Sequence, residues 1–134
     1  MKILVDTQIF LWLFGFVNRI SPDVESLLKN PRNEIFLSAA SVWEIAIKYA
    51  SGKLQLPDAP EIFVPDRVNR SNFKRLEINY EHTLEAAKLP PIHKDPFDRL
   101  LIAQANIENF TLLSSDGIFS KYNVKLIDSE TFKI

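Results

Sequence analysis

The chain has 134 residues, of which 46% are hydrophobic and 25% are charged. This balance is typical of one globular domain and excludes a disordered or fibrous chain. There is no cysteine, which excludes disulfides, thiol nucleophiles and cysteine-ligated metal centres. A formal charge of −1 gives no overall bias toward nucleic acid. We therefore expect a single domain over residues 1–134 that is stabilised by its own hydrophobic core.

The N-terminal region is apolar but too short to cross a membrane. The longest apolar run covers residues 9–17, whereas a spanning helix needs about 20 residues. Asp6 interrupts the apolar start, and no small-residue cleavage site follows Val17. These features predict a cytoplasmic protein without a membrane span or signal peptide, and the lack of cysteine agrees with a reducing compartment.

The predicted elements alternate between short apolar strands and helices along the chain. We expect strands at residues 2–6, 34–37, 73–78, 110–114 and 124–127. We expect helices at residues 8–16, 22–30, 38–51, 60–70, 80–89 and 96–109, and a short helical turn at 117–122. Ser21 and Asp95, each followed by a proline, mark two helix starts. Pro65 should kink its helix or delay its start.

This alternation predicts an α/β fold with a central, mostly parallel sheet of about five strands flanked by helices. In such sheets, ligands bind beyond the carboxyl ends of the strands. Asp6 directly follows the first predicted strand, and Asp116 follows the strand near residues 111–115 in the same way. Each of these two acids is equally well explained as a helix N-cap.

Two further acids lie within apolar helix patterns. Glu44 lies in residues 42–47, which are apolar nearly all round, and a buried carboxylate must be paired or bind a metal. The alternative for Glu44 is an ordinary surface pair with Lys48, four residues on. Asp98 shares a helix face with Leu101 and should point toward the sheet, although a favourable place in the helix dipole would also explain it.

Four inward carboxylates would repel one another unless something positive lay among them. The four are Asp6, Glu44, Asp98 and Asp116. All-oxygen ligation suits Mg²⁺ or Mn²⁺, and such a site can polarise a phosphodiester and lower the pKa of a bound water. The pattern therefore predicts one or two divalent ions, with Asp95 as a candidate to support Asp98 from the start of the same helix.

Four segments, in order and spread over essentially the whole chain, resemble the PIN-domain family. The segments are LVDT at residues 4–7, SAASVWEIAIK at 38–48, DPFDRLLIAQA at 95–105 and LLSSD at 112–116. More narrowly, they resemble the VapC-type toxins of bacterial toxin–antitoxin pairs. The resemblance implies a PIN-like three-layer fold and a metal-dependent endoribonuclease that hydrolyses RNA with a metal-activated water.

The resemblance also implies roles for particular residues. The four acids match the family's acidic cluster position by position, and Thr7 and Ser115 match places where a hydroxyl usually supports that cluster. Two positions depart from the pattern: Gln8 stands where a histidine is frequent, and Pro65 interrupts a segment that is usually a clean helix. The implied partners are an RNA substrate, a small cognate antitoxin and a second copy of the chain. The alternative is a catalytically weak PIN-like scaffold that binds RNA or protein.

Basic residues gather between residues 48 and 75, where six basic residues stand against three acidic ones. This segment fits a phosphate-facing patch and a solvated polar face equally well. The candidate RNA-binding residues are Lys48, Lys53, Lys94 and Arg99. For Lys94 and Arg99, an ion pair with Asp95 or another neighbour is an equal alternative.

Other conspicuous side chains are better explained as structural. Core or interface packing is favoured over base stacking for the aromatic residues Phe10, Trp12, Phe14 and Phe16. The two histidines, His82 and His93, lack a zinc-type spacing and are interpreted as ordinary polar residues.

Overall fold

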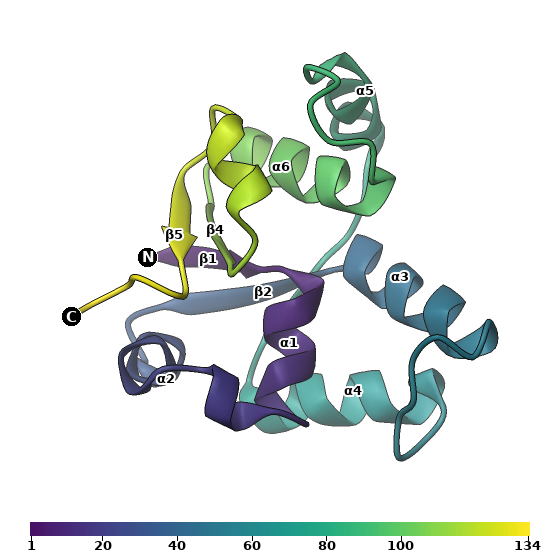
Figure 1. The fold of residues 1–134 in the computed structure, drawn as a ribbon, viewed down its shortest axis with the longest axis vertical. Helices are drawn as coiled ribbons and strands as arrows, with labels where there is room; N and C mark the ends of the chain where they lie inside the picture. Colours follow the sequence, from purple (N-terminus) through teal and green to yellow (C-terminus); the bar gives the residue numbers. More distant parts are fainter.

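The computed structural model describes residues 1–134, which form a five-stranded sheet between layers of helices (Figure 1). The strand order is β3-β2-β1-β4-β5, and every neighbouring pair is parallel. The strands are β1 (Lys2–Val5), β2 (Glu34–Ser38), β3 (Lys74–Leu76), β4 (Thr111–Ser114) and β5 (Leu126–Asp128). The predicted α/β fold is confirmed, and the sheet is parallel throughout.

Helices cover both faces of this sheet. They are α1 (Thr7–Leu13), α2 (Pro22–Lys29), α3 (Ala39–Ala50), α4 (Pro60–Ser71), α5 (Tyr80–Lys88) and α6 (Pro96–Glu108), with short 3₁₀ turns η1 (Val17–Arg19) and η2 (Gly117–Lys121). Helices α1, α2 and α4 lie on one side of the sheet in Figure 1, and α5, α6 and η2 lie on the other. None of the helices has the length and apolar character that crossing a bilayer requires.

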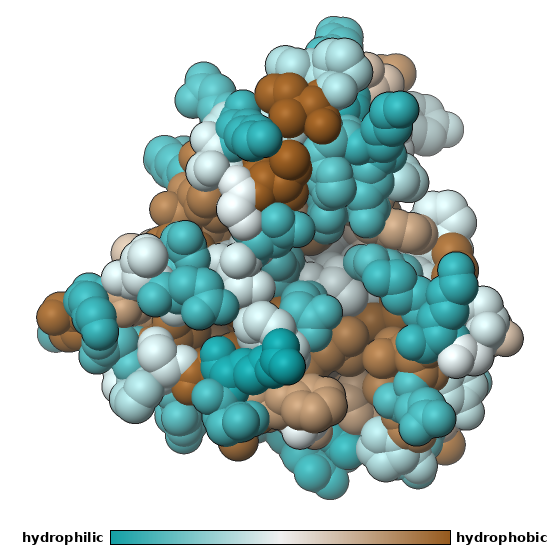
Figure 2. Space-filling view, in the orientation of Figure 1, coloured by the Kyte–Doolittle hydropathy of each residue, from teal (hydrophilic) through white to brown (hydrophobic).

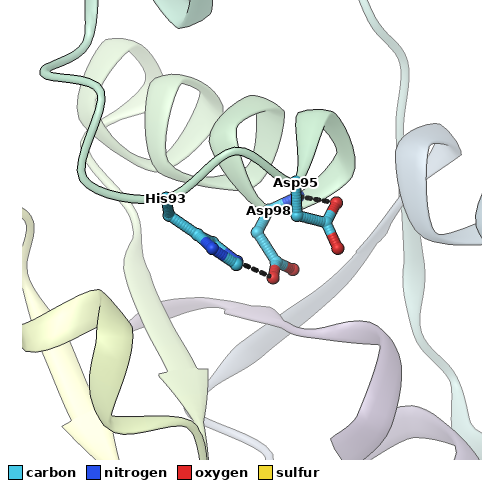
Figure 3. A group of neighbouring side chains, drawn as sticks. All are labelled: His93, Asp95 and Asp98. Carbon is cyan, nitrogen blue, oxygen red and sulfur yellow. Dashed lines mark hydrogen bonds and ion pairs between the residues drawn. The ribbon is translucent and has the colours of Figure 1, made fainter.

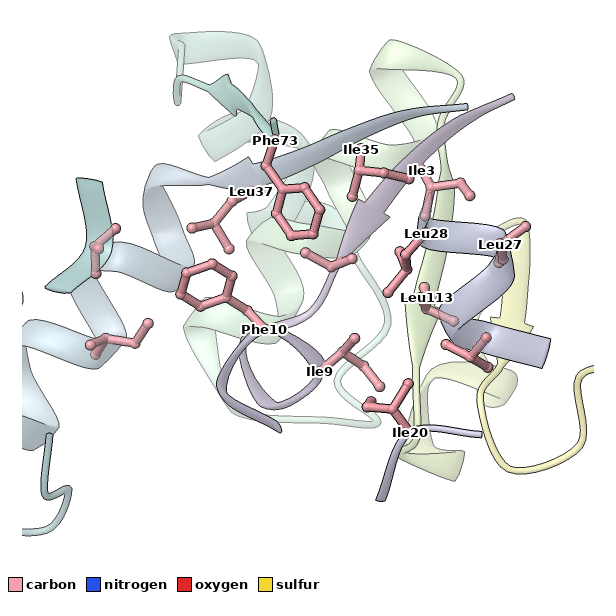
Figure 4. Close-up of a cluster of buried hydrophobic side chains, with 14 of the residues drawn as sticks. Ile3, Ile9, Phe10, Ile20, Leu27, Leu28, Ile35, Leu37, Phe73 and Leu113 are labelled. Atoms are coloured by element: carbon pink, nitrogen blue, oxygen red, sulfur yellow. The ribbon is translucent and has the colours of Figure 1, made fainter. Parts of the chain in front are cut away.

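The alternation of side chains along β1 divides the core in two. Ile3 and Val5 pack against the α1, α2 and α4 side, where Phe10 lies at the centre of a cluster of buried side chains (Figure 4). Leu4 points to the opposite face and packs with Leu101 of α6. Both faces of β1 are fully buried, as expected for a central strand of a parallel sheet.

Local signals set most of the helix ends. The Ser21 hydroxyl accepts a hydrogen bond from Val24 N at the start of α2, as predicted. Asn109 adopts the left-handed conformation that ends α6. Pro65 does not delay the start of its helix, because α4 runs without a break from Pro60. Pro65 is exposed, so water can hydrate the carbonyl oxygen that loses its helical partner there.

The two edge strands are shorter than the sequence pattern predicts. The third predicted strand, residues 73–78, is reduced to the three residues of β3, and the last begins at Leu126 instead of Val124. Short edge strands limit the unpaired backbone that a sheet edge presents to other chains. The central strands, by contrast, end where the predicted site residues begin.

Candidate active site

A pocket of about 550 Å³ opens at the carboxyl ends of β1 and β4. Its walls come from α1, α3, α6 and the turn that begins η2. All four predicted acids line it: Asp6, Glu44, Asp98 and Asp116. On the face shown in Figure 2, apolar surface is uncovered in the hollow between helices α1, α3 and α4, with hydrophilic residues around it. Leu11, Ile45 and Leu54 contribute apolar side chains to the pocket wall.

Asp6 is both a helix cap and a pocket residue. Its Oδ1 accepts a hydrogen bond from Ile9 N at 2.8 Å at the start of α1, and its Oδ2 accepts one from the Ser114 hydroxyl at 2.5 Å. The carboxyl is almost completely buried. Burial raises the pKa of Asp6 to about 7, against the effect of the two hydrogen bonds, and the charges of Asp98 and Asp116 raise it further.

Glu44 is a buried carboxylate with only one oxygen paired. Its Oε2 accepts a hydrogen bond from Lys48 Nζ at 2.7 Å, as the ion-pair alternative requires. Its Oε1 is buried and has no hydrogen-bond partner. The hydrogen bond with Glu44 raises the pKa of Lys48 above its usual value, and the charges of Asp95 and Asp98 act in the same direction. Glu44 therefore combines a helical ion pair with a buried oxygen that has no hydrogen-bond partner.

Asp98 points inward from the first turn of α6 and is bound by a histidine. Its Oδ2 lies 2.7 Å from His93 Nε2 (Figure 3). Burial raises the pKa of Asp98 to about 6, and the charges of Asp95 and Glu44 add to this, whereas the hydrogen bond with His93 opposes it. The interpretation of His93 as an ordinary polar residue missed this contact. Its only sequence signal was its place five residues before Asp98.

Asp95 and Asp116 cap helical turns at the pocket rim. Asp95 Oδ1 accepts hydrogen bonds from the backbone N–H groups of Phe97 and Asp98, and Asp116 Oδ1 accepts one from Ile118 N. In both residues the second carboxylate oxygen makes no hydrogen bond within the protein. Ligand atoms of His93, Asp95 and Asp98 lie within 4.8 Å of one another (Figure 3). Asp95 and Asp116 therefore each cap a helical turn and also line the pocket.

Comparison with known proteins identifies the fold family. Residues 3–125 match the PIN domain. The chain belongs to the PIN-domain family. It is 43% identical over 61 residues to ribonuclease VapC16 of Mycobacterium tuberculosis, a match that covers 46% of this chain and 43% of that protein.

Solved structures share the fold over nearly the whole PIN domain. The VapBC2 structure from Rickettsia felis, bound to a promoter DNA fragment, matches with a TM-score of 0.71 and 19% identity over 96% of this chain and 98% of that one. The DNA-bound VapBC structure from Salmonella typhimurium matches with a TM-score of 0.68 and 14% identity, again over 96% and 98%. These likenesses extend over both helical layers and the sheet.

The hydroxyl groups around the PIN-domain pocket differ from expectation. The hydroxyl that binds Asp6 belongs to Ser114, whereas Ser115 lines the pocket half-buried and makes no hydrogen bond to the acids. Thr7 donates its hydroxyl hydrogen to Ser41 Oγ at 2.9 Å and thereby ties α1 to α3. Thr7 therefore makes no direct hydrogen bond to the acids.

The basic candidates separate into three kinds. Lys48 lines the pocket and binds Glu44. Lys53 and Lys94 are exposed outside it. Arg99 does not line the pocket, and its guanidinium group instead donates to backbone carbonyls of the last turn of α5 and of the α5–α6 loop. This geometry favours a structural role for Arg99 over contact with phosphate.

The aromatic residues of α1 divide between the core and the surface. Phe10 is fully buried, and Phe14 packs edge-to-face against it with ring centroids 5.2 Å apart. The predicted core role of these two residues is confirmed. Phe16 is exposed, and the Arg19 guanidinium lies over the rings of Phe16 and Trp12.

The pocket residues fit a divalent cation. A buried Glu44 oxygen lacks a hydrogen-bond partner, and burial together with neighbouring carboxylates raises the pKa values of Asp6 and Asp98. A cation among these groups would relieve both conditions. Carboxylate oxygens are the donors that Mg²⁺ and Mn²⁺ prefer.

Proposed function

We propose that this PIN domain is an Mg²⁺- or Mn²⁺-dependent endoribonuclease that acts as the toxin of a toxin–antitoxin pair. The convergence of four acids on one pocket, with a buried Glu44 oxygen left unpaired, carries the proposal. The ribonuclease activity is supported by the 43% identity to a ribonuclease over 61 residues. The toxin role is supported by the fold shared with VapBC toxin–antitoxin complexes.

In this proposal Asp6, Glu44 and Asp98 hold the metal, with Asp116 at the open rim. A divalent ion held there would supply positive charge that polarises a phosphodiester and makes a water molecule more acidic. Ile9 N and Ser114 hold the two oxygens of Asp6 in a fixed orientation. His93 does the same for one oxygen of Asp98. These contacts fix the orientation of Asp6 and Asp98 before a cation binds.

An acidic pocket repels a polyanion, so RNA needs basic groups around it. Lys48 is placed for this task, because its ammonium group lies at the pocket wall and its side chain is half exposed. Lys53 and Lys94 remain proposals for contacts farther along the RNA backbone. An RNA substrate also implies action in the cytoplasm.

The test is RNA cleavage by wild-type protein and Asp6→Asn, purified in parallel and assayed with Mg²⁺, Mn²⁺ or EDTA. Asp58→Asn serves as a matched control, since Asp58 is exposed and does not line the pocket. We expect metal-dependent cleavage by the wild type and Asp58→Asn alone. Equal cleavage by Asp6→Asn would show a contaminating nuclease and contradict the assignment.

The alternative function is a scaffold that binds RNA or protein without cleaving RNA. Calorimetric titration with Mn²⁺ separates the two, because the scaffold requires no metal binding. Absence of heat at millimolar Mn²⁺, together with no cleavage of structured RNAs, would favour the scaffold.

The proposed partners are a cognate antitoxin and a second copy of the chain. The acidic pocket would accept a basic side chain from an antitoxin segment, which would block both metal and RNA. For the homodimer, the support is an exposed apolar strip on α3, where Trp43 and Ile47 are 58% and 43% exposed. Trp43 packs against Phe97 of α6, so this strip continues onto a second helix.

A further inference from the structure

Arg99 follows Asp98 directly, but its side chain binds the last turn of α5 and the loop between α5 and α6. Nη2 donates two hydrogen bonds of 2.8 Å, and Nη1 donates hydrogen bonds of 2.9 and 3.1 Å. The acceptors are the backbone carbonyl oxygens of Ala86, Leu89, Pro90 and His93. These four bonds use the four N–H groups on the two terminal nitrogens, and Nη1 also lies 3.5 Å from the Tyr122 hydroxyl. None of these N–H groups therefore remains for a phosphate group.

Tyr122 binds the same loop through its hydroxyl group. Its hydroxyl accepts a hydrogen bond from His93 N and donates one to the Pro90 carbonyl, both at 2.8 Å. The Tyr122 side chain is buried, and the residue directly follows η2, which begins after Asp116. Tyr122 therefore joins the segment that carries Asp116 to the loop that leads into α6.

The loop at residues 89–95 carries two groups of the pocket. His93 binds Asp98 Oδ2, and Asp95 caps the first turn of α6, from which Asp98 projects. The loop has few backbone hydrogen bonds of its own, notably the one from Ile92 N to Pro90 O. Its conformation thus depends on side chains from outside the loop.

We propose that Arg99 and Tyr122 are positioning residues for the acidic pocket. They hold residues 89–95 so that His93 keeps its hydrogen bond to Asp98 and Asp95 keeps its place at the start of α6. Their effect on metal binding rests on the proposed function, whereas their effect on the loop does not. This role replaces phosphate binding as the explanation of Arg99.

Tyr122→Phe is the mildest test, because it removes one hydroxyl and keeps the buried ring. Tyr49→Phe is the matched control, since Tyr49 is exposed and its hydroxyl makes no hydrogen bond within the protein. Hydrogen exchange of the Phe97 and Asp98 amides in the metal-free protein reports on the loop, because these amides bind Asp95 and not Tyr122. We expect about tenfold faster exchange in Tyr122→Phe, the effect of losing a typical buried hydrogen bond, and no change in Tyr49→Phe.

The same variants are titrated with Mn²⁺ and assayed on RNA. We expect Tyr122→Phe to bind Mn²⁺ about tenfold more weakly and to lose kcat while KM stays unchanged, since the carboxylates lose their fixed placement and the RNA contacts do not. Exchange rates and Mn²⁺ affinity at the level of Tyr49→Phe would overturn the proposal.

Arg99→Lys separates positioning from phosphate contact. A lysine keeps the charge but cannot reproduce the planar fork that serves four carbonyls. We expect faster loop exchange and lower kcat in this variant. An increase in KM with kcat and exchange unchanged would show that Arg99 contacts RNA, and it would overturn the positioning role.

Substitutions of His93 test whether the loop acts on Asp98 through the His93–Asp98 hydrogen bond. A glutamine amide can donate to Asp98 as the imidazole does, whereas leucine cannot. We expect His93→Gln to retain most of the Mn²⁺ affinity that His93→Leu loses, and equal loss in both would contradict the positioning role. If wild-type protein neither binds Mn²⁺ nor cleaves RNA, the proposed function fails, while the exchange measurements still decide whether Arg99 and Tyr122 hold the loop.

Discussion

Ser114 at the end of β4 donates its hydroxyl hydrogen to Asp6 at the end of β1, across 108 residues of sequence. The same oxygen accepts a hydrogen bond from Asp116 N, so one side chain fixes a buried acid and the backbone of another. The parallel pairing of β1 with β4 creates this contact, because it brings the carboxyl ends of both strands to the same edge.

Ser114→Ala should weaken metal binding at neutral pH and spare it at high pH. The Ser114 hydrogen bond lowers the pKa of Asp6, so its removal raises that pKa further and lets protons compete with the cation. Mn²⁺ titrations at pH 7 and pH 8.5 measure the difference. Ser115→Ala is the matched control, and an equal loss of affinity in both variants would contradict the prediction.

Asp6→Asn should stabilise the metal-free protein at pH 8. The pKa of Asp6 is about 7 in the folded protein and has an ordinary value of 3.8, so the folded state binds more protons between these values. Stability of the wild type therefore falls as pH rises from about 4 to about 7 and then levels off. Asparagine removes this loss, because its amide can still accept from Ile9 N and donate to Ser114.

Thermal unfolding in EDTA between pH 5 and pH 8 checks this prediction. We expect the melting temperature of Asp6→Asn to exceed that of the wild type by several degrees at pH 8, with a smaller gap at pH 5. Saturating Mn²⁺ should reverse the order, since only the wild type gains from binding. If Asp6→Asn were less stable than the wild type at every pH, burial of the charged Asp6 carboxylate would not lower the stability of the wild type.

Gln104→Leu should destabilise the fold by about 2–4 kcal/mol, because it leaves buried polar groups unpaired. Gln104 is fully buried, accepts a 2.5 Å hydrogen bond from the Ser38 hydroxyl and donates one of 3.2 Å to the Glu77 carbonyl. Ser38 also caps α3, so the contact joins α3 to α6. Urea unfolding measures the loss.

A double-mutant cycle with Ser38→Ala serves as the control for Gln104→Leu. The combined variant should lose less than the sum of the two single variants, since each removes the partner of the other. Strict additivity would show that the two side chains do not interact in solution.

Trp43→Glu should convert the proposed homodimer into a monomer. A charge on the exposed strip formed by Trp43 and Ile47 would have to be buried without a partner in the interface. Light scattering of the purified protein gives the mass directly. Phe16→Glu is a control at another exposed aromatic residue, and a dimer that survives Trp43→Glu would exclude this face.

The sequence predicted those features that short segments determine. Strands ended within a few residues of their predicted positions, and Ser21 and Asp95 cap the helices that they were expected to start, since a cap and its helix are adjacent in sequence. The places of Asp6 and Asp116 in the pocket followed from the rule that parallel strands present their carboxyl ends at one edge. Glu44 and Asp98 were predicted instead as inward acids in apolar helix patterns.

Contacts between distant segments escaped prediction. Ser114 was passed over for its neighbour Ser115, because only the strand register shows which hydroxyl faces Asp6. Arg99 was grouped with phosphate-binding candidates, although three of its four carbonyl partners lie in a loop whose path no local pattern specifies. Neither placement has a signature in composition or periodicity.

The order in which the acids occur along the chain has a consequence for synthesis. β1 is made first, but its neighbour β4 is completed only at Ser114, and Asp116 follows later still. A growing chain therefore lacks part of the acidic wall until translation has passed these residues. The proposed metal site would therefore be complete only after almost the whole chain has been synthesised.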